Sequence, residues 1–317
     1  MPFDATPTAN RPGPSSAVTA HAPVMLSEAL AGLAVRAEGI YVDATFGRGG
    51  HSRAVLDALA GSGMLHAFDQ DPEAIAHAHV AFAGDANFRI HHANFSALGE
   101  AARSVGIAGR IDGILLDLGV SSPQLDQAER GFSFGRDGPL DMRMNPQAGL
   151  SAAQWLAQAE ESEIADVLWR YADERNSRRI ARRIVETRVE TPILRTAQLA
   201  ELIASVPGPR THGINPATRS FQAIRIHINR ELEVLESVLA QTVELLAPGG
   251  RLAVISFHSL EDRIAKRFIR DASQTSSHGE SLNPTLRRIA KQFPSPAECR
   301  QNPRARSAVL RVAERLS

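Results

Sequence analysis

Short apolar runs alternate with helix-like stretches along this chain, and the alternation constrains its fold more than any other feature. The runs cover residues 40–47, 63–71, 88–95 and 111–119, and helical spacing of apolar residues follows the first two runs. Strands that alternate with helices form parallel sheets covered by helices. The sequence therefore predicts an α/β protein.

The alternation is interrupted once. Residues 126–148 are typical of an ordered loop. Residues 151–206 have a helical pattern, and Ser151 with Gln154 predicts a capping box at its start. Strand-like runs return at residues 251–259 and 307–316, after a helix with apolar residues at spacings of three and four. We therefore predict one α/β domain built from residues 21–125 and 215–317, and a mainly helical domain inserted at residues 126–214 for substrate recognition.

Composition limits the classes of partner and compartment. The 35 basic and 35 acidic side chains cancel, so a nucleic acid must be bound by a local patch. The single cysteine, Cys299, excludes an internal disulfide and a cysteine-based zinc site and fits a cytoplasmic location. No apolar run reaches the ~18 residues that span a membrane, no histidine spacing indicates a metal site, and residues 1–20 are typical of a disordered tail.

A glycine-rich loop, GRGGHS, follows the first apolar run. Gly47 and Gly49 fit a dinucleotide fingerprint, but Ser52 stands at the position of its third glycine. The loop also lacks the Gly-Lys-Ser/Thr ending of a phosphate-binding loop. A tight turn between a strand and a helix explains the glycines about as well as a nucleotide site does.

Asp69 favours the nucleotide site. It ends the second apolar run, where a carboxylate can accept hydrogen bonds from both hydroxyls of a ribose. A helix N-cap is the alternative role, but Asp71, which precedes Pro72, is the better cap candidate. The ligand is then NAD or S-adenosylmethionine (SAM). The missing third glycine favours SAM, which has no pyrophosphate to hold against a helix N-terminus.

A second polar loop ends the fourth apolar run. The segment LLDLGVSSPQL, residues 115–125, places Asp117 at the carboxyl end of a strand, where open α/β sheets bind ligands. Amino-methyltransferases line their target amine with acidic or polar residues followed by proline. A plain polar turn after a strand is the alternative interpretation.

Longer segments resemble one family. They include HAPVML, DATFGRGGHS, LLDLGVSSPQLD, GPLDMRM, NPATRSFQAIRIHINREL, ISFHSLEDR and NPRARSAVLR. The chain resembles the bacterial 16S ribosomal RNA cytosine N4-methyltransferases, which methylate the exocyclic amine of a cytidine in the decoding centre. The resemblance runs from about His21 to Glu314, and residues 1–20 depart from it.

The resemblance implies a Rossmann-like, SAM-dependent methyltransferase sheet with an inserted helical domain. It also implies 16S rRNA as the partner, within the small ribosomal subunit and without a membrane; the sequence leaves monomer and homodimer open. The implied cofactor-binding residues are Gly49, Gly50, His51, Asp69, Phe95, Asp117 and Gln124. Gln124 replaces the aromatic residue of the Ser-Pro-Pro-aromatic loop found in amino-methyltransferases, so stacking on the base must come from elsewhere.

Methylation of a cytosine amine requires hydrogen-bond acceptors. The amine lone pair is delocalised into the ring, so acceptors must hold the amine hydrogens and turn the lone pair toward the methyl group. The candidate catalytic groups are the Asp117 carboxylate, the Ser122 hydroxyl and the Pro123 carbonyl. Methylation at carbon C5 would need a cysteine nucleophile, and Cys299 is far in sequence from the predicted strand ends.

Two basic clusters are candidates for an RNA surface. One is the helical segment with Arg175, Arg178, Arg179, Arg182 and Arg183; the other is residues 287–317, with eight basic and two acidic side chains. A solvated helix face explains the first cluster equally well. Phe132 and Phe134 could stack on a base, but a core position is the more common role of such residues.

Three further functions remain open at this point. The same cofactor loop would suit a DNA or small-molecule methyltransferase. It would also suit a non-catalytic ribosome-assembly factor that binds SAM, although Asp117 and the Ser-Ser-Pro loop argue against a pure binding role. A dehydrogenase is the most distant alternative, and preferential stabilisation by NAD would indicate it.

Overall fold

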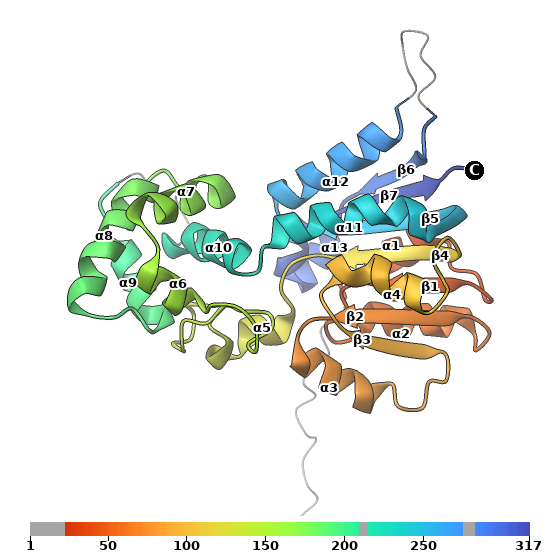
Figure 1. Cartoon of the computed structure of the whole chain (residues 1–317), viewed down its shortest axis with the longest axis horizontal. Helices are drawn as coiled ribbons and strands as arrows, with labels where there is room; N and C mark the ends of the chain where they lie inside the picture. The colour runs from red at the N-terminus through yellow and green to blue at the C-terminus, as the bar shows by residue number, and fades with distance from the viewer. Residues whose placement is uncertain (1–22, 209–214, 275–282) are drawn as a thin grey trace, which may run out of the picture.

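The fold is a seven-stranded sheet with helices on both faces, seen in a computed structural model that describes residues 23–208, 215–274 and 283–317. The strand order in this part of the chain is β3-β2-β1-β4-β5-β7-β6 (Figure 1). Neighbouring strands from β3 to β5 are parallel, and β7 pairs antiparallel with both β5 and β6. The strands are β1 (Ile40–Asp43), β2 (Met64–Asp69), β3 (Phe88–His92), β4 (Ile111–Asp117), β5 (Leu246–Ser256), β6 (Leu286–Gln292) and β7 (Val309–Arg315).

Alternating side chains build a core on each face of the sheet. Leu115 of β4 packs in one cluster, and the next residue, Leu116, packs in the other. The first face is covered by α1 (Leu26–Leu33), α2 (Gly50–Leu59) and α3 (Pro72–Ala81); the second by α4 (Leu98–Ser104), α11 (Glu231–Leu245) and α12 (Ser259–Ala272). Burial on both faces explains the nearly continuous apolar runs. The predicted Rossmann-like sheet is confirmed.

A group of helices beside the sheet has its own core (Figure 1). The capping box predicted at Ser151 begins the first of them. The helices are α6 (Ala152–Gln158), α7 (Glu161–Ala172), α8 (Ser177–Glu190), α9 (Thr196–Ser205) and α10 (Ala217–Ile228). Phe221 and Ile224 of α10 belong to this core, so its packing continues past the boundary expected at residue 214. We call α6–α10 the helical unit.

The sequence prediction missed β6. Its residues were interpreted only as part of a basic run, because Arg287, Arg288 and Lys291 interrupt the apolar pattern of a strand. These three side chains are exposed on the last strand of the sheet. Charged residues on such an edge prevent it from pairing with other chains.

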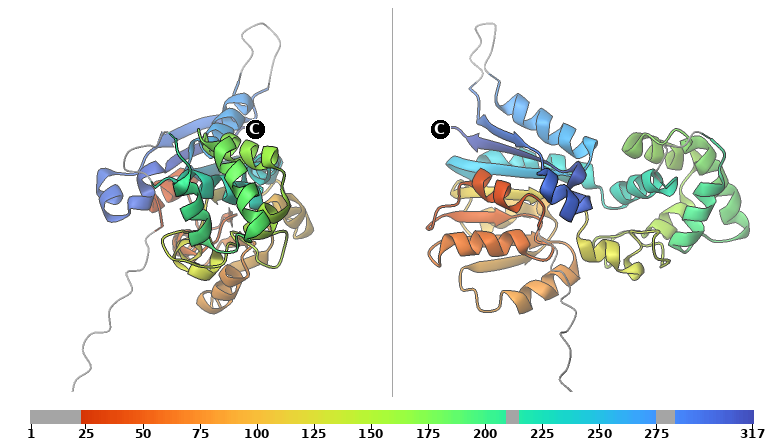
Figure 2. Two further views of the ribbon diagram at one scale, coloured as in Figure 1. Left: turned by 90° about the vertical axis from the view of Figure 1, so that its left-hand side faces the viewer. Right: turned by 180° about the vertical axis from the view of Figure 1, so that it is seen from behind.

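Short elements connect these parts. They are α5 (Ser122–Asp126), α13 (Pro296–Gln301), η1 (Phe95–Ala97), η2 (Ala128–Arg130) and η3 (Pro303–Ser307). Viewed from behind, α13 lies at the end of the sheet that faces the helical unit (Figure 2). None of the helices in the described residues is long and apolar enough to cross a membrane.

Replacing Ile114, which is fully buried in β4, with alanine tests the core on the second face. We expect Ile114→Ala to lower the free energy of unfolding by about 3 kcal/mol, because the lost side chain leaves a cavity. Urea denaturation measures this change. Val80→Ala is the matched control, since Val80 is 81% exposed and its loss should cost under ~0.5 kcal/mol. Equal effects of the two substitutions would contradict this assignment of the core.

Candidate active site

A cavity of about 890 Å³ lies at the carboxyl ends of the parallel strands. Its walls come from the segments that follow β1, β2, β3, β4 and β5, and Met144 and Asn229 line it near the helical unit. Eight of the predicted site residues line it: Gly50, His51, Asp69, Phe95, Asp117, Ser122, Pro123 and Gln124. The fold therefore brings together residues that are up to 74 positions apart, from Gly50 to Gln124.

Gly49 is the predicted site residue that the cavity lining omits. It precedes α2 with a left-handed φ of 74°. A Cβ atom at this position would lie 2.6 Å from the rings of Phe46 and Phe82. The glycine is thus required for the turn and for close packing of these two rings, and its neighbour Gly50 reaches the cavity instead.

Asp69 is held by backbone donors at the end of β2. Its Oδ2 accepts a hydrogen bond from the Gly47 amide (2.8 Å), and its Oδ1 accepts one from the Asp71 amide (2.9 Å). Burial raises the pKa of Asp69 to about 6, although both amides act in the opposite direction. Each carboxylate oxygen has a second lone pair, so the geometry leaves Asp69 able to accept hydrogen bonds from ribose hydroxyls.

Asp117 ends β4 with one oxygen free. Its Oδ2 lies 3.5 Å from Nδ1 of His51. Its Oδ1 is buried, and no donor among the described residues reaches it. Burial raises the pKa of Asp117 to about 6; the His51 ring opposes this shift, and the carboxylates of Asp43 and Glu261 add to it. A buried acceptor without a partner is uncommon in folded proteins and indicates a place for a ligand donor.

Ser122 and Pro123, the other two candidate acceptors, already have partners. The Ser122 hydroxyl accepts a hydrogen bond from Arg304 Nη1 (2.8 Å). The Pro123 carbonyl accepts one from the Gln127 amide (2.9 Å) at the end of α5. Of the three predicted catalytic groups, Asp117 is therefore the one with an oxygen that no donor among the described residues reaches.

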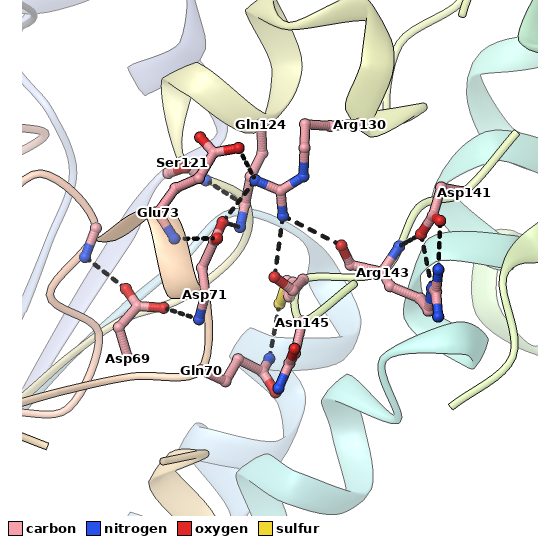
Figure 3. A network of polar contacts seen from close by, with 12 residues as sticks. Asp69, Gln70, Asp71, Glu73, Ser121, Gln124, Arg130, Asp141, Arg143 and Asn145 are labelled. Carbon is pink, nitrogen blue, oxygen red and sulfur yellow. Dashed lines mark hydrogen bonds and ion pairs between the residues drawn. The ribbon is translucent and has the colours of Figure 1, made fainter. Parts of the chain in front are cut away.

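Both the oxygen and the nitrogen of the Gln124 side-chain amide form hydrogen bonds that hold the loop. Its Oε1 accepts a hydrogen bond from the Ser121 amide (2.9 Å), and its Nε2 donates to Asp71 Oδ2 (2.8 Å). Figure 3 shows this side chain pointing to Asp71. Gln124 is only 5% exposed, so its main contribution is to hold the Ser121–Pro123 turn against the loop after β2.

Arg130 was not predicted from the sequence. Its buried guanidinium donates from Nη1 to Asp71 Oδ2 (2.8 Å) and from Nη2 to the carbonyls of Arg143 (3.3 Å) and Met144 (3.0 Å) (Figure 3). Asp71 also caps α3, as predicted, by accepting from the Glu73 amide. An arginine in a polar loop has no sequence signature that distinguishes it from a surface arginine.

Two further residues at the cavity mouth were missed. Phe257, directly after β5, lines the cavity, and its ring lies 3.5 Å from an ideal Cβ on Gly119. Arg304, in η3, reaches from the C-terminal region to Ser122 and Asp126. An aromatic residue directly after a strand was the available signal for Phe257, whereas the contact of Arg304 spans 182 positions along the chain.

Glu231, His258 and Glu261 place potential metal-binding atoms within 4.8 Å of one another. Arg225 neutralises Glu231 through two hydrogen bonds of 2.8 and 2.9 Å. Glu261 lies 3.0 Å from His258 Nε2 and accepts hydrogen bonds from the amides of Phe257 and His258. These partners account for the cluster as a support of the β5–α12 turn.

The cavity suits a nucleoside ligand with positive charge. Asp69 offers acceptors for ribose hydroxyls, and the vacant oxygen of Asp117 suits an amine or ammonium donor. Asp69, Asp117, Asp126, Glu231 and Glu261 line the cavity, against Arg48 and Arg304 on the basic side. This excess of carboxylates favours the sulfonium and ammonium groups of SAM over a pyrophosphate.

A mostly parallel sheet, with a cavity lined by acidic groups at the carboxyl ends of its parallel strands, is typical of SAM-binding α/β proteins of the methyltransferase class. The model of the MraW methylase family matches residues 18–316, so the chain belongs to that family. This membership confirms the predicted family and the prediction of a SAM-dependent methyltransferase.

Named relatives are similar over most of their length. A protein of Xanthomonas euvesicatoria pv. vesicatoria named ribosomal RNA small subunit methyltransferase H is 59% identical over 304 residues, covering 94% of this chain and 89% of the relative. A protein of the same name from Thioalkalivibrio sulfidiphilus is 58% identical over 308 residues, covering 94% and 98%.

Solved structures are more distant. An rRNA methylase from Streptococcus thermophilus has a TM-score of 0.42 and 14% identity, covering 92% of this chain and 95% of the other. A protein described as a putative rRNA methylase from Clostridium thermocellum has a TM-score of 0.45 and 11% identity, covering 94% and 100%.

Arg130→Met tests the buried ion pair with Asp71. We expect it to lower the free energy of unfolding by about 3–5 kcal/mol, because it leaves the Asp71 carboxylate buried without its cation. Urea denaturation of the single variant and of Arg130→Met/Asp71→Asn measures this, and the double variant should recover part of the loss. Arg36→Met is the control, since Arg36 is exposed and its pair with Asp112 should contribute under ~1 kcal/mol. No recovery in the double variant would contradict the explanation.

The raised pKa of Asp69 predicts pH-dependent SAM binding. If ionised Asp69 accepts the ribose hydrogen bonds, as the sequence predicts, affinity should be highest above its pKa of about 6 and fall as the pH drops through 6. Calorimetric titration with SAM should give an affinity about tenfold lower one unit below that pKa. Asp69→Asn should bind weakly at every pH with a flatter dependence. If the SAM affinity of Asp69→Asn depended on pH as strongly as that of the wild type, another group would be responsible for the titration.

Proposed function

We propose that this chain transfers the methyl group of SAM to the exocyclic N4 amine of a cytidine in the decoding centre of 16S rRNA. The observation that carries the proposal is Asp117, which lines the cavity and whose buried Oδ1 has no donor among the described residues; an amine needs an acceptor of this kind. The names of the relatives, ribosomal RNA small subunit methyltransferase H, support rRNA of the small subunit as the substrate.

Bound SAM would supply an electrophilic methyl group, and this chain's residues would orient the amine. Asp117 would accept one amine hydrogen and turn the nitrogen lone pair toward the methyl group. Ser122 lies in the same cavity wall and keeps its own hydroxyl hydrogen for a base acceptor while it accepts from Arg304. Positioning of this kind supplies much of the rate of a direct in-line transfer.

Stacking on the cytosine ring falls to Phe257 in this proposal. The Ser-Ser-Pro loop has Gln124 in place of an aromatic residue, and Gln124 is bound to Ser121 and Asp71. Phe257 is an aromatic side chain of the same cavity near Gly119, directly before that loop. An RNA base outside a helix commonly stacks on such a ring.

The surroundings of the cavity support a large anionic substrate. Four basic side chains are exposed along the end of β6, α13 and η3: Lys291, Arg300, Arg304 and Arg306. Arg304 also lines the cavity. The five arginines of the helical-segment cluster are exposed on the helical unit: Arg175, Arg178, Arg179, Arg182 and Arg183. We assign both surfaces to the RNA backbone and the inserted segment to substrate recognition.

Other assignments have less support. Phe132 is buried, and Phe134 packs edge-on against Phe221 at 5.0 Å, so both belong to the core rather than to an RNA surface. DNA and small molecules remain the alternative acceptors. The single cysteine fits a reducing compartment, which is our basis for proposing a cytoplasmic location.

Methyl transfer from labelled SAM tests the proposal. The acceptors are small ribosomal subunits from cells that lack this protein, their naked 16S rRNA, and duplex DNA, with nucleoside mass spectrometry of the products. We expect N4-methylcytidine in the ribosomal RNA and an Asp117→Ala rate at least ~100-fold lower, because an acceptor of the amine proton is lost. Asp57→Ala, an exposed position on α2, is the control. Methylation of DNA alone, or of no acceptor despite SAM binding, would refute the proposal.

A further inference from the structure

The side chain of His51 lies between a carbonyl and a carboxylate. Its ring is 7% exposed in the first turn of α2. Nε2 lies 3.2 Å from the Val24 carbonyl oxygen, and Nδ1 lies 3.5 Å from Asp117 Oδ2. The sequence resemblance placed His51 with the cofactor, but these two contacts engage both nitrogens of the ring with the protein.

The chemistry of these two contacts limits how many protons the His51 ring and the Asp117 carboxyl group carry. A carbonyl oxygen accepts hydrogen bonds and cannot donate, so Nε2 must carry a hydrogen. If His51 were then neutral, the bare lone pair of Nδ1 would face the carboxylate of Asp117. That arrangement is repulsive unless one more proton lies between Nδ1 and Oδ2. The pair is stable when it holds one shared proton, whether on the ring or on the carboxyl group.

We infer that His51 and Asp117 act as a pair that carries one proton in total, held at the Nδ1–Oδ2 contact, and that His51 is thereby a positioning residue that leaves Oδ1 of Asp117 as the acceptor for the target amine. The inference deepens the proposed function and rests on it. It accounts for two observations on this cavity-lining residue together: Oδ2 lies near His51, and Oδ1 is buried without a donor among the described residues.

The remaining charges near the pair are mostly acidic. Asp43 of β1 is buried behind it and accepts hydrogen bonds from Ser52 Oγ (2.7 Å) and the Thr45 amide (3.1 Å). Glu261 of α12 faces Asp117 from the other side, and Arg225 and His258 face Glu261. Asp69 faces Asp43 in turn. A proton held between His51 and Asp117 reduces the repulsion among these carboxylates.

The reaction balances through this arrangement. As the amine nitrogen forms the new N–C bond, the S–C bond of the donor breaks and its electron pair stays on sulfur. The amine proton moves to Asp117 Oδ1, which is free because the shared proton occupies the side of Oδ2. Oδ1 returns the proton to water when the methylated base leaves the cavity.

The pair predicts the direction of a pH shift. The positive charge of His51 lowers the pKa of Asp117, which burial raises to about 6. The ionised carboxylate is the acceptor, so activity should fall as the pH drops through this pKa. Asparagine can still donate to Oδ2 but carries no charge, so the pKa of Asp117 should rise in His51→Asn, by about 1 unit.

Two measurements on the full-length protein test the inference. The first is the pH profile of methyl transfer to small ribosomal subunits, where His51→Asn should shift the acid midpoint of kcat/KM upward and keep most of the activity at high pH. His77→Asn is the matched control, because His77 lines the same cavity and packs against Phe46. Its midpoint should equal that of the wild type.

The second measurement is nitrogen-15 NMR of the histidine rings without SAM, with the His51 signals assigned by their loss in His51→Asn. We expect Nε2 protonated and Nδ1 shifted toward the protonated position, and we expect Asp117→Asn to return Nδ1 to a bare nitrogen at neutral pH. A bare Nδ1 in the wild type, or an unchanged midpoint in His51→Asn, would overturn the inference. Absence of cytidine methylation by the wild type would instead refute the proposed function, and NMR would then decide on the shared proton alone.

Discussion

The buried ion pair between Asp71 and Arg130 holds the active site together. Asp71 belongs to the loop after β2, and Arg130 belongs to the segment between the sheet and the helical unit. Oδ2 of Asp71 accepts from both Arg130 and Gln124, and Arg130 also binds the carbonyls of Arg143 and Met144 (Figure 3). Removal of Arg130 would leave the Asp71 carboxylate buried without its cation, so the geometry of three loops depends on this contact.

Burial of carboxylates explains the chemistry of the cavity. Asp43, Asp69 and Asp117 end or follow neighbouring parallel strands, which brings them to one edge of the sheet. Desolvation raises the pKa of each of them, and their mutual repulsion adds to the shift at Asp69 and Asp117. A cationic ligand with amine and hydroxyl donors relieves both costs, whereas an anionic pyrophosphate would increase them. The buried carboxylates of the cavity therefore favour a cationic cofactor such as SAM over an anionic one.

Sequence patterns predicted the parts of the structure that depend on local periodicity. The buried strands, the capping box at Ser151 and the N-cap at Asp71 follow from short-range rules, and eight predicted site residues do line one cavity. β6 was missed because its exposed edge carries charges. Arg130 and Arg304 were missed because their partners lie 59 and 182 positions away, and only the folded chain brings them together. The roles assigned to the site residues remain predictions.

The same network also connects two parts of the cavity wall, the loop at Asp69 and the Ser121–Pro123 turn. The amide of Asp71 donates to Asp69, the proposed ribose acceptor, and the carboxylate of Asp71 accepts from Gln124, which holds the Ser121–Pro123 turn. A single residue therefore connects the proposed ribose site with the loop proposed to hold the target amine. In-line transfer tolerates little error in the approach of nitrogen to the methyl group. A short, buried connection meets this requirement better than two independently anchored loops, because it limits the relative displacement of the two loops.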